Sequence, residues 1–348
     1  MSREEVYDVT IVGGGPTGLY TAFYAGMRDL RTKIIEYHPH LGGKLHVYLE
    51  KVIWDIGGLP PTTGERVVEH LVEQGTTFDP TVVLETRVEK IERDEDSVLR
   101  LYCAGGDVHL SRTVILALGH GVLNPKKLAI DGAGKFEVTN LYYTVGSLSR
   151  FRGKHVLISG GGNAAIDWAN TLEPVAERVV ISHRREEFTG HERSILDMRA
   201  SSVRTMTPYS IKELHAEGDE VSSVSLENAE TGEVEKIKVD AVIVNHGFDS
   251  DVGFIEENEF RRKGDYCIVV DKHMQTNIPG IFAAGDLVDY DGKLHLISGC
   301  FVEGATAVNS AKLYLEPEAE ESAYVSSHNE RFREKNRSLE LQGAIDGR

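Results

Sequence analysis

Three glycines near the N-terminus have the spacing of a phosphate-binding turn. The motif Gly13-x-Gly15-x-x-Gly18 directly follows the apolar run Tyr7–Val12. In such a motif the first glycine permits a tight turn, the second lets backbone approach a pyrophosphate, and the third lets helix and strand pack closely. Backbone N–H groups at the helix start would face the phosphates. Glu36 ends the next apolar run, where a carboxylate can accept hydrogen bonds from adenosine ribose hydroxyls and repels a 2′-phosphate.

A second glycine loop follows another apolar run, His155–Ser159, and leads to a basic corner. Its returning run, Arg178–Ser182, is followed at once by His183-Arg184-Arg185. Cations at this corner suit a 2′-phosphate, which arginine can bind through two parallel hydrogen bonds. We therefore predict FAD or NAD at the first site and NADPH at the second, the alternative being glycine-rich turns with solvated charges. The predicted NADPH-binding residues are Gly160, Gly162, Asn163, Ala165, His183, Arg184 and Arg185.

Each glycine loop lies inside the same sequence of elements. After the first loop a helical pattern continues to about Met27, and Thr32–Glu36 is the next strand. After the second loop a helical pattern covers 166–172 before the strand Arg178–Ser182. A strand, a helix and a returning strand make a parallel βαβ unit. We therefore predict an α/β protein with two Rossmann-like nucleotide-binding domains.

Other strands end in glycine or aspartate. Thr113–Gly121 and Asp240–Gly247 close the two units, and Thr276–Asp286 follows them. Asp286 begins a predicted helix, where its backbone amide or carboxylate could contact a ribitol or a pyrophosphate; the alternative role is a helix N-cap. The segment 326–348 is predicted to be a polar helix with a frayed end.

Composition limits the class of protein. The chain has 348 residues, a formal net charge of −17 and 41% apolar residues, which suits two globular domains rather than a disordered chain. No apolar run approaches a membrane span, no signal peptide precedes the first strand, and the negative charge disfavours nucleic acid. Three scattered cysteines without metal-ligand spacing fit buried thiols in a reducing cytoplasm. We predict no metal site.

Two dinucleotide sites in one chain imply hydride transfer between two bound cofactors. That step needs a stacking geometry more than a general acid or base, so we expect neither a catalytic triad nor a metal. A dithiol would offer one exit for the electrons, and the sequence has none.

Three segments, Gly13–Gly18, Gly160–Ala165 and Gly280–Asp286, together resemble the thioredoxin-reductase-like flavoproteins. That family carries a redox Cys-x-x-Cys shortly before the second glycine loop, where this chain has Asn140–Ser147 without cysteine. The chain therefore resembles the dithiol-free branch, the ferredoxin–NADP⁺ reductases of the thioredoxin-reductase type. The segments that carry the resemblance are Gly13–Gly18, Gly42–Tyr48, Trp54–Pro60, Gly160–Ala165, Gly280–Asp286 and Ser326–His328.

The resemblance implies an NADPH domain inserted into a discontinuous FAD domain. The FAD domain would comprise residues 1–120 and 248–325, the NADPH domain 121–247, and a C-terminal extension covering the flavin 326–348. Tyr48 would stack on one flavin face, and His328 would cover the other from the partner subunit of a homodimer. Lys44 stands where the family usually has glutamine. The implied FAD contacts are Thr17, Glu36, Lys44, Tyr48, Val88, Leu123, Asp286 and Ser327.

The resemblance also implies an activity, in which NADPH reduces FAD and electrons leave singly to ferredoxin or flavodoxin. Such acceptors are acidic, so docking on this acidic chain requires a local basic patch. Part of the tail is one hypothesis for that patch, the alternative being a solvated helix. Two other functions stay open: a diaphorase acting on ferric chelates, quinones or a small disulfide, and a flavin-binding redox sensor. The basic residues of the tail are Arg331, Arg333, Lys335 and Arg337.

Overall fold

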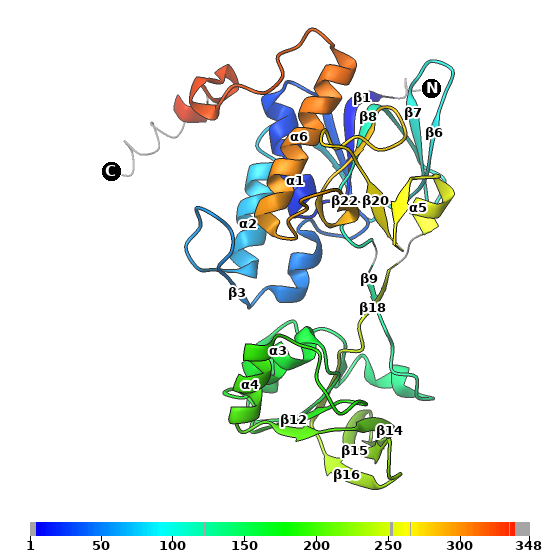
Figure 1. Ribbon diagram of the computed structural model, residues 1–348, viewed down its shortest axis with the longest axis vertical. Coiled ribbons are helices and arrows are strands. Elements are labelled where there is room, and N and C mark those ends of the chain that lie inside the picture. The colour runs from blue at the N-terminus through cyan, green and yellow to red at the C-terminus, as the bar shows by residue number, and fades with distance from the viewer. Residues whose placement is uncertain (1–4, 122, 251–252, 265, 334, 338–348) are drawn as a thin grey trace. The chain divides into compact units, whose positions relative to one another are not determined.

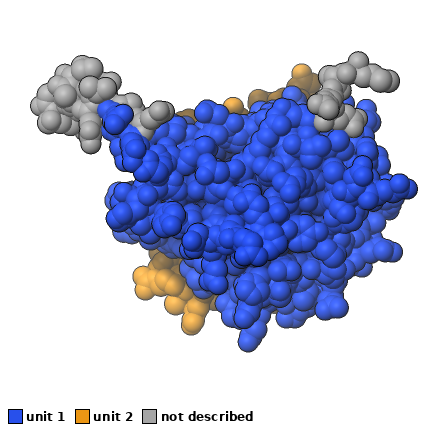
Figure 2. Space-filling view, turned by 90° about the horizontal axis from the view of Figure 1, so that it is seen from above, with its two compact units in different colours: residues 1–122, 250–348 blue, residues 123–249 orange. Residues whose placement is uncertain are grey.

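Two segments far apart in the sequence build the first of two compact units. The computed structural model describes residues 5–121, 123–250, 253–264, 266–333 and 335–337. Unit 1 consists of Met1–Val122 and Ser250–Arg348, and unit 2 of Leu123–Asp249 (Figure 2). Two short strands that pair with each other, β9 (Leu123–Pro125) and β18 (Phe248–Ser250), connect the units. Unit 2 is thus an insertion within unit 1.

A seven-stranded sheet forms the centre of unit 1 (Figure 1). Strand β1 lies between β2 and β8 and is parallel to both. Strand β21 is parallel to the second half of β8, whereas β6 and β7 form an antiparallel hairpin beside its first half. The strands are β1 (Val6–Val12), β2 (Thr32–Ile35), β5 (Thr81–Val83), β6 (Val88–Arg93), β7 (Leu99–Cys103), β8 (Val108–Leu116) and β21 (Ile281–Ala283).

Apolar residues on both faces explain why β1 becomes a central strand. Ile11 is fully buried and Val12 nearly so, and these successive residues point to opposite faces of the sheet. A parallel sheet covered on both faces produces such near-continuous apolar runs. The carboxyl ends of β1, β2, β8 and β21 consequently meet at one edge of the sheet, where loops can gather around a ligand.

Helices α1, α2 and α6 lie together on one side of this sheet (Figure 1). Helix α1 begins with Pro16, whose fixed φ suits the first helical position. Helix α2 buries Val67, Val68 and Leu71 along one face. The α-helices of unit 1 are α1 (Pro16–Met27), α2 (Gly64–Gly75), α5 (Gly253–Glu257) and α6 (Ile297–Leu315). Its smaller sheets contain β3 (Val52–Ile53), β4 (Thr62–Thr63), β19 (Arg262–Lys263), β20 (Cys267–Val269) and β22 (Val288–Asp289).

Unit 2 repeats the α/β plan with a five-stranded parallel sheet. Strand β11 lies between β12 and β17, and Leu157 and Ile158 at its centre are fully buried. An antiparallel three-stranded sheet, β14-β15-β16, completes the unit. The elements are β10 (Leu141–Tyr142), β11 (His155–Ser159), α3 (Asn163–Leu172), β12 (Arg178–Ser182), α4 (Glu192–Ala200), β13 (Arg204–Met206), β14 (Tyr209–Glu217), β15 (Glu220–Asn228), β16 (Val234–Lys238) and β17 (Ala241–Val244).

Short 3₁₀ turns supply several of the segments that matter for the sites. Two of them, separated at Asn329, form the start of the tail, which was expected to be one helix from residue 326. Residues 333 and 335–337 are α-helical. Among the described residues, no helix combines the length and apolar character needed to cross a membrane. The 3₁₀ turns are η1 (Gly43–Tyr48), η2 (Ala133–Phe136), η3 (Leu148–Phe151), η4 (Gly285–Leu287), η5 (Ser326–His328) and η6 (Glu330–Phe332).

Candidate functional site

The first glycine loop joins β1 to α1 at the carboxyl edge of the unit 1 sheet. The Gly13 N–H donates to the Ile35 carbonyl at 2.8 Å. Gly18 packs so closely on the loop that a Cβ there would overlap the Gly13 carbonyl oxygen. Gly15 is the N-cap of α1. No described side chain forms a capping hydrogen bond with the first amides of this helix. The first amides of α1 are therefore available to an anion such as a pyrophosphate.

The Glu36 carboxylate is fixed beside this loop. Its side chain is buried. Oε2 accepts a hydrogen bond from the Gly14 N–H at 2.6 Å, and Oε1 accepts one from the His38 N–H at 2.8 Å. A carboxylate oxygen can accept more than one hydrogen bond, so both oxygens keep capacity for ribose hydroxyls. Two backbone amides thus orient Glu36 as the predicted role requires.

A polar cluster lies at the same edge, after β8 and β21. The His120 Nδ1 lies 3.5 Å from the Asp286 Oδ2, and the His120 ring centroid lies 5.0 Å from that of Tyr266. Burial lowers the pKa of His120, and the Lys44 ammonium lowers it further. The structure therefore brings together two residues predicted to contact FAD, Lys44 and Asp286. His120 was not predicted, although its position between two glycines directly after a strand was a usable signal.

Thr17 and Asp286 meet through the turn η4. Gly285, the first residue of η4, lies against the Thr17 hydroxyl at the beginning of α1. The Asp286 side chain is partly exposed. This contact places η4 next to the first glycine loop, where the sequence predicted a ribitol or pyrophosphate contact.

The other predicted FAD contacts of unit 1 lie in different elements. Tyr48 ends η1, is half-buried, and has the Lys51 Nζ at 5.5 Å from its ring centroid. Val88 is buried at the start of β6, two positions after Thr86, whose N–H donates to the Glu36 carbonyl at 3.0 Å. Leu123 begins β9, and its side chain lies outside the described residues.

The tail residues Ser327 and His328 lie at the opposite end of α1 from the glycine loop. Both are exposed, and they are held there by their neighbours. The Asn329 Nδ2 donates to the Met27 carbonyl at 3.1 Å, and the Phe332 ring lies 6.0 Å from Phe23. A helix of 12 residues rises about 18 Å, so one chain does not bring its own His328 to its Gly15 loop.

The tail also differs from the expected basic patch. Arg331 forms an ion pair with Asp29 at 3.0 Å, and Arg333 forms one with Glu330. Two of the cations assigned to acceptor docking are therefore already paired with carboxylates. Such pairing lowers the positive potential that an acidic partner would meet.

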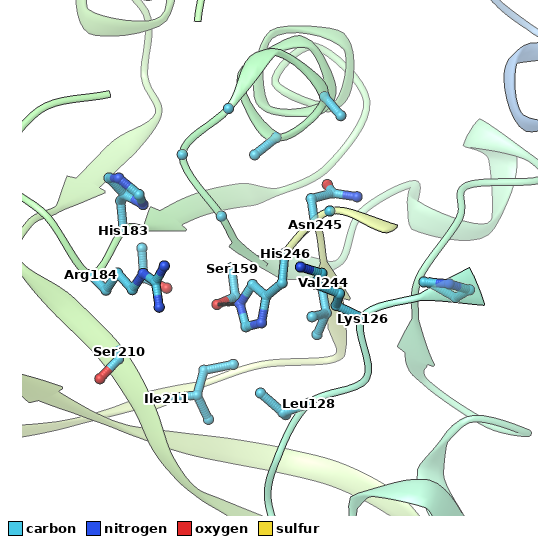
Figure 3. Close-up of a pocket in the computed structure, with 18 of the residues that line it drawn as sticks. Lys126, Leu128, Ser159, His183, Arg184, Ser210, Ile211, Val244, Asn245 and His246 are labelled. Atoms are coloured by element: carbon cyan, nitrogen blue, oxygen red, sulfur yellow. Dashed lines mark hydrogen bonds between the residues drawn. The ribbon is translucent and has the colours of Figure 1, made fainter. Parts of the chain in front are cut away.

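In unit 2 a cavity of about 720 Å³ opens at the second glycine loop (Figure 3). Gly162 is the N-cap of α3 without a capping side chain, so this helix also presents its first amides. The lining comes from the loop, from the corner after β12, from β14 and from the end of β17. These residues include Gly160, Gly162, Asn163, Ala165, His183, Arg184, Arg185, Tyr209, Ile211 and His246.

Cations and unpartnered polar atoms face this cavity. Arg184 and Arg185 are exposed, and neither forms an ion pair with another described residue. Within the described part of the chain, three buried lining atoms have no hydrogen-bond partner, which is unusual unless a polar ligand supplies one. Burial, reinforced by Arg185 and Arg184, lowers the pKa of His183, which favours its neutral form. The unpartnered atoms are Ser182 Oγ, His183 Nε2 and Asn245 Oδ1.

Three polar lining residues form hydrogen bonds within the protein. The Asn163 Oδ1 accepts a hydrogen bond from the His191 N–H at 2.7 Å, so this side chain fixes the neighbouring loop. Ser159 and His246, not predicted, form a hydrogen bond of 2.9 Å between Oγ and Nε2. Figure 3 shows both side chains near Arg184. The signal for His246 was its position near the carboxyl end of the predicted strand segment 240–247.

The chain is similar to known proteins over most of its length. Residues 7–309 match the family model described as pyridine nucleotide-disulphide oxidoreductase. A protein of Bacillus pumilus named ferredoxin–NADP reductase 1 is 52% identical over 340 residues, covering 98% of each chain. The chain belongs to the pyridine nucleotide-disulphide oxidoreductase family.

Solved structures with the same fold include thioredoxin reductases. That of Lactococcus lactis, in the FR conformation, has a TM-score of 0.73 at 25% identity, covering 89% of this chain and 99% of its own. That of T. acidophilum has a TM-score of 0.75 at 21% identity, covering 91% and 100%. The predicted two-domain α/β fold and the family resemblance are thereby confirmed.

This pyridine nucleotide-disulphide oxidoreductase lacks a suitable thiol pair of its own. Cys103, Cys267 and Cys300 are free and lie in β7, β20 and α6. Burial raises the pKa of Cys103 to about 11 and that of Cys300 to about 12, whereas redox-active cysteines need accessible thiolates. Disulfide chemistry on these cysteines is therefore disfavoured.

Proposed function

We propose that this chain catalyses electron transfer from NADPH to ferredoxin or flavodoxin, using bound FAD. The observation that carries the proposal is the unit 2 cavity, where a glycine loop lies beside Arg184 and Arg185, which form no ion pair with another described residue. Unit 1 of the same chain carries another glycine loop of the dinucleotide-binding type. The 52% identity to a ferredoxin–NADP reductase over almost the whole chain supports the choice of acceptor.

In unit 1 the residues fit FAD. The first amides of α1 would bind the pyrophosphate, and Glu36, held by the Gly14 and His38 amides, would accept from the adenosine ribose. Thr17, Lys44 and Asp286 would hold the middle of the cofactor, at the edge where the structure gathers them. Tyr48 would stack on one face of the flavin, as the family resemblance implies.

In unit 2 the residues fit NADPH. Arg184 and Arg185 would bind the 2′-phosphate, and the first amides of α3 the pyrophosphate. The unpartnered Ser182 Oγ and Asn245 Oδ1 would gain hydrogen bonds from the ligand. When both cofactors are bound, they supply hydride transfer and one-electron release, which is chemistry of the cofactors themselves.

The same proposal includes a homodimer of this chain. Because Ser327 and His328 are anchored at the far end of α1, we place them over the flavin of a partner subunit in a homodimer. The three free cysteines support a reducing compartment, the cytoplasm.

The test is NADPH-dependent reduction of cytochrome c, with and without added ferredoxin. We expect ferredoxin to stimulate the rate strongly and the stimulation to fall with salt, because association of a charged acceptor is screened. If ferredoxin and flavodoxin do not stimulate while NADPH still bleaches the flavin, the acceptor is wrong and the chain is a diaphorase. Bound FAD that NADPH does not reduce would instead favour a redox sensor.

A further inference from the structure

A charged pair is buried beneath the turn η4. The Lys293 Nζ lies 2.6 Å from the Glu303 Oε1, and their side chains are only 5% and 3% exposed. Tyr290 donates its hydroxyl hydrogen to the same Oε1 at 2.9 Å. Glu303 belongs to α6, and Lys293 and Tyr290 lie between β22 and α6. None of the three was singled out by the sequence, and none has a part in the function proposed above.

The pair holds both polar backbone groups of one residue, Gly285. The Gly285 N–H donates to the Glu303 Oε2 at 2.7 Å, and the Gly285 carbonyl accepts from the Lys293 Nζ at 2.9 Å. Gly285 has a φ of +84°, a conformation in which a side chain is strained, and it lies against the Thr17 hydroxyl. The Glu303–Lys293 pair therefore fixes both the conformation of the turn η4 and the contact of this turn with α1.

Because the Glu303–Lys293 pair is buried, the loss of one of its two charges should disturb the turn η4. A buried ion pair contributes little net stability, but removing one partner leaves the other charge uncompensated in the interior. If the Glu303 carboxylate became an amide, the Gly285 N–H, the Tyr290 hydroxyl and the Lys293 ammonium would donate to a weaker acceptor. Gly285, the residue that Glu303 holds, is followed at once by Asp286 in the same turn.

We propose that Glu303 is a positioning residue for FAD, which acts through the backbone of Gly285 to hold the Gly285-Asp286 turn against Thr17. Lys293 and Tyr290 orient the Glu303 carboxylate for this task. The inference rests on the proposed binding of FAD by unit 1, and it adds residues that do not themselves touch the cofactor.

The test is titration of the full-length apoprotein with FAD. We expect Glu303→Gln to raise the Kd for FAD about tenfold or more, the effect of losing a charge-assisted hydrogen bond. Glu316→Gln is the matched control, because Glu316 forms a 2.7 Å pair with Lys312 on the same helix but is 55% exposed. It should leave the Kd unchanged. Circular dichroism of each apoprotein verifies that it is folded at the titration temperature.

A milder variant keeps the proposal testable if Glu303→Gln does not fold. Tyr290→Phe removes one neutral donor from the carboxylate without leaving a buried charge, and we expect a smaller rise in the Kd for FAD in the same direction. If folded Glu303→Gln, or Tyr290→Phe in its place, binds FAD like the wild type and differs only in unfolding temperature, the pair is merely structural and the proposal is overturned.

Failure of the proposed function would look different. A wild-type apoprotein that binds no FAD, or a holoprotein whose flavin NADPH does not reduce, contradicts the function whatever the variants do. Normal reduction of the wild-type flavin together with unchanged Kd values in the folded variants contradicts only the role of Glu303.

Discussion

At the scale of single residues, we propose that the charge following β12 decides which nicotinamide cofactor unit 2 prefers. Arg184 and Arg185 line the cavity beside the second glycine loop, with no ion pair to another described residue. Two guanidinium groups without acidic partners favour a ligand with an additional phosphate. NADH lacks that phosphate, so it should gain little from them.

Replacing both arginines should therefore remove the preference. We expect Arg184→Ala combined with Arg185→Ala to lower kcat/KM for NADPH by about 10- to 100-fold, the loss of one or two charge-assisted hydrogen bonds, with little change for NADH. Steady-state reduction of ferricyanide with each nucleotide measures this. Arg193→Ala is the control, because Arg193 is an exposed arginine of α4 paired with Asp197 outside the cavity. Equal losses with both nucleotides would refute the assignment.

Residues of the two glycine loops could be predicted because their partners are close in sequence. Gly13 and Gly18 pack on each other within a single turn, and spacing alone indicates that contact. Glu303 could not be found in this way, because it acts on Gly285 from another element. His120 needs Asp286 and Tyr266, which lie in a separate segment of the chain. Such pairs depend on the folded topology rather than on a local pattern.

At the scale of elements, the fit of α1 on β1 sets the geometry of the first site. Helix α1 can approach only because Gly18 has no Cβ to collide with the Gly13 carbonyl. Any side chain there must push the helix from the strand or distort the loop. Both changes would move the first amides of α1 away from the pyrophosphate they are proposed to bind.

Gly18→Ala should accordingly impair both folding and FAD retention. We expect about 1–3 kcal/mol of destabilisation, the usual cost of overpacking, with loss of FAD during purification. Thermal unfolding and the ratio of flavin to protein absorbance measure the two effects. Gly57→Ala is the control, because a Cβ at Gly57 meets nothing within 4 Å. A Gly18→Ala protein with full flavin content would contradict the close packing of α1 on β1.

The tail shows how tertiary contacts can override a local helical pattern. Polar residues after position 326 suggested one helix, but the structure has two 3₁₀ turns separated at Asn329. The Asn329 side chain accepts from the Arg331 N–H and donates to the Met27 carbonyl. The hydrogen bond to Met27, together with Phe332 packing on Phe78, ties the segment to α1 and to the loop after α2. Met27 and Phe78 are far from the tail in the sequence, beyond the reach of any local pattern.

At the scale of the whole molecule, partly buried imidazoles make stability depend on pH. Burial lowers the pKa of several histidines, so their folded forms resist protonation more than the unfolded chain does. His109 is an example outside both cofactor sites, where the nearby Lys33 ammonium, 3.2 Å from its Nδ1, lowers the pKa further and Asp107 opposes this. The partly buried histidines concerned are His109, His120 and His183.

The sign of the effect follows from which state binds more protons. Well above the unfolded histidine pKa of about 6.5, both states are neutral and these groups contribute nothing to stability. As the pH falls below that value, the unfolded chain takes up protons that the folded protein refuses, so stability falls. Each histidine contributes less than about 1.4 kcal/mol per pH unit, and the loss ends below its folded pKa.

We therefore expect the urea-unfolding midpoint of the apoprotein to decrease between about pH 7.5 and pH 5.5, the range that spans histidine titration. His109→Asn should make that decrease shallower, because it removes a group that titrates in the unfolded state but is suppressed in the folded one. His328→Asn is the control, since His328 is exposed on η5. An identical pH dependence in the wild type and His109→Asn would show that His109 is protonated equally in both states, and that burial beside Lys33 does not hold it neutral.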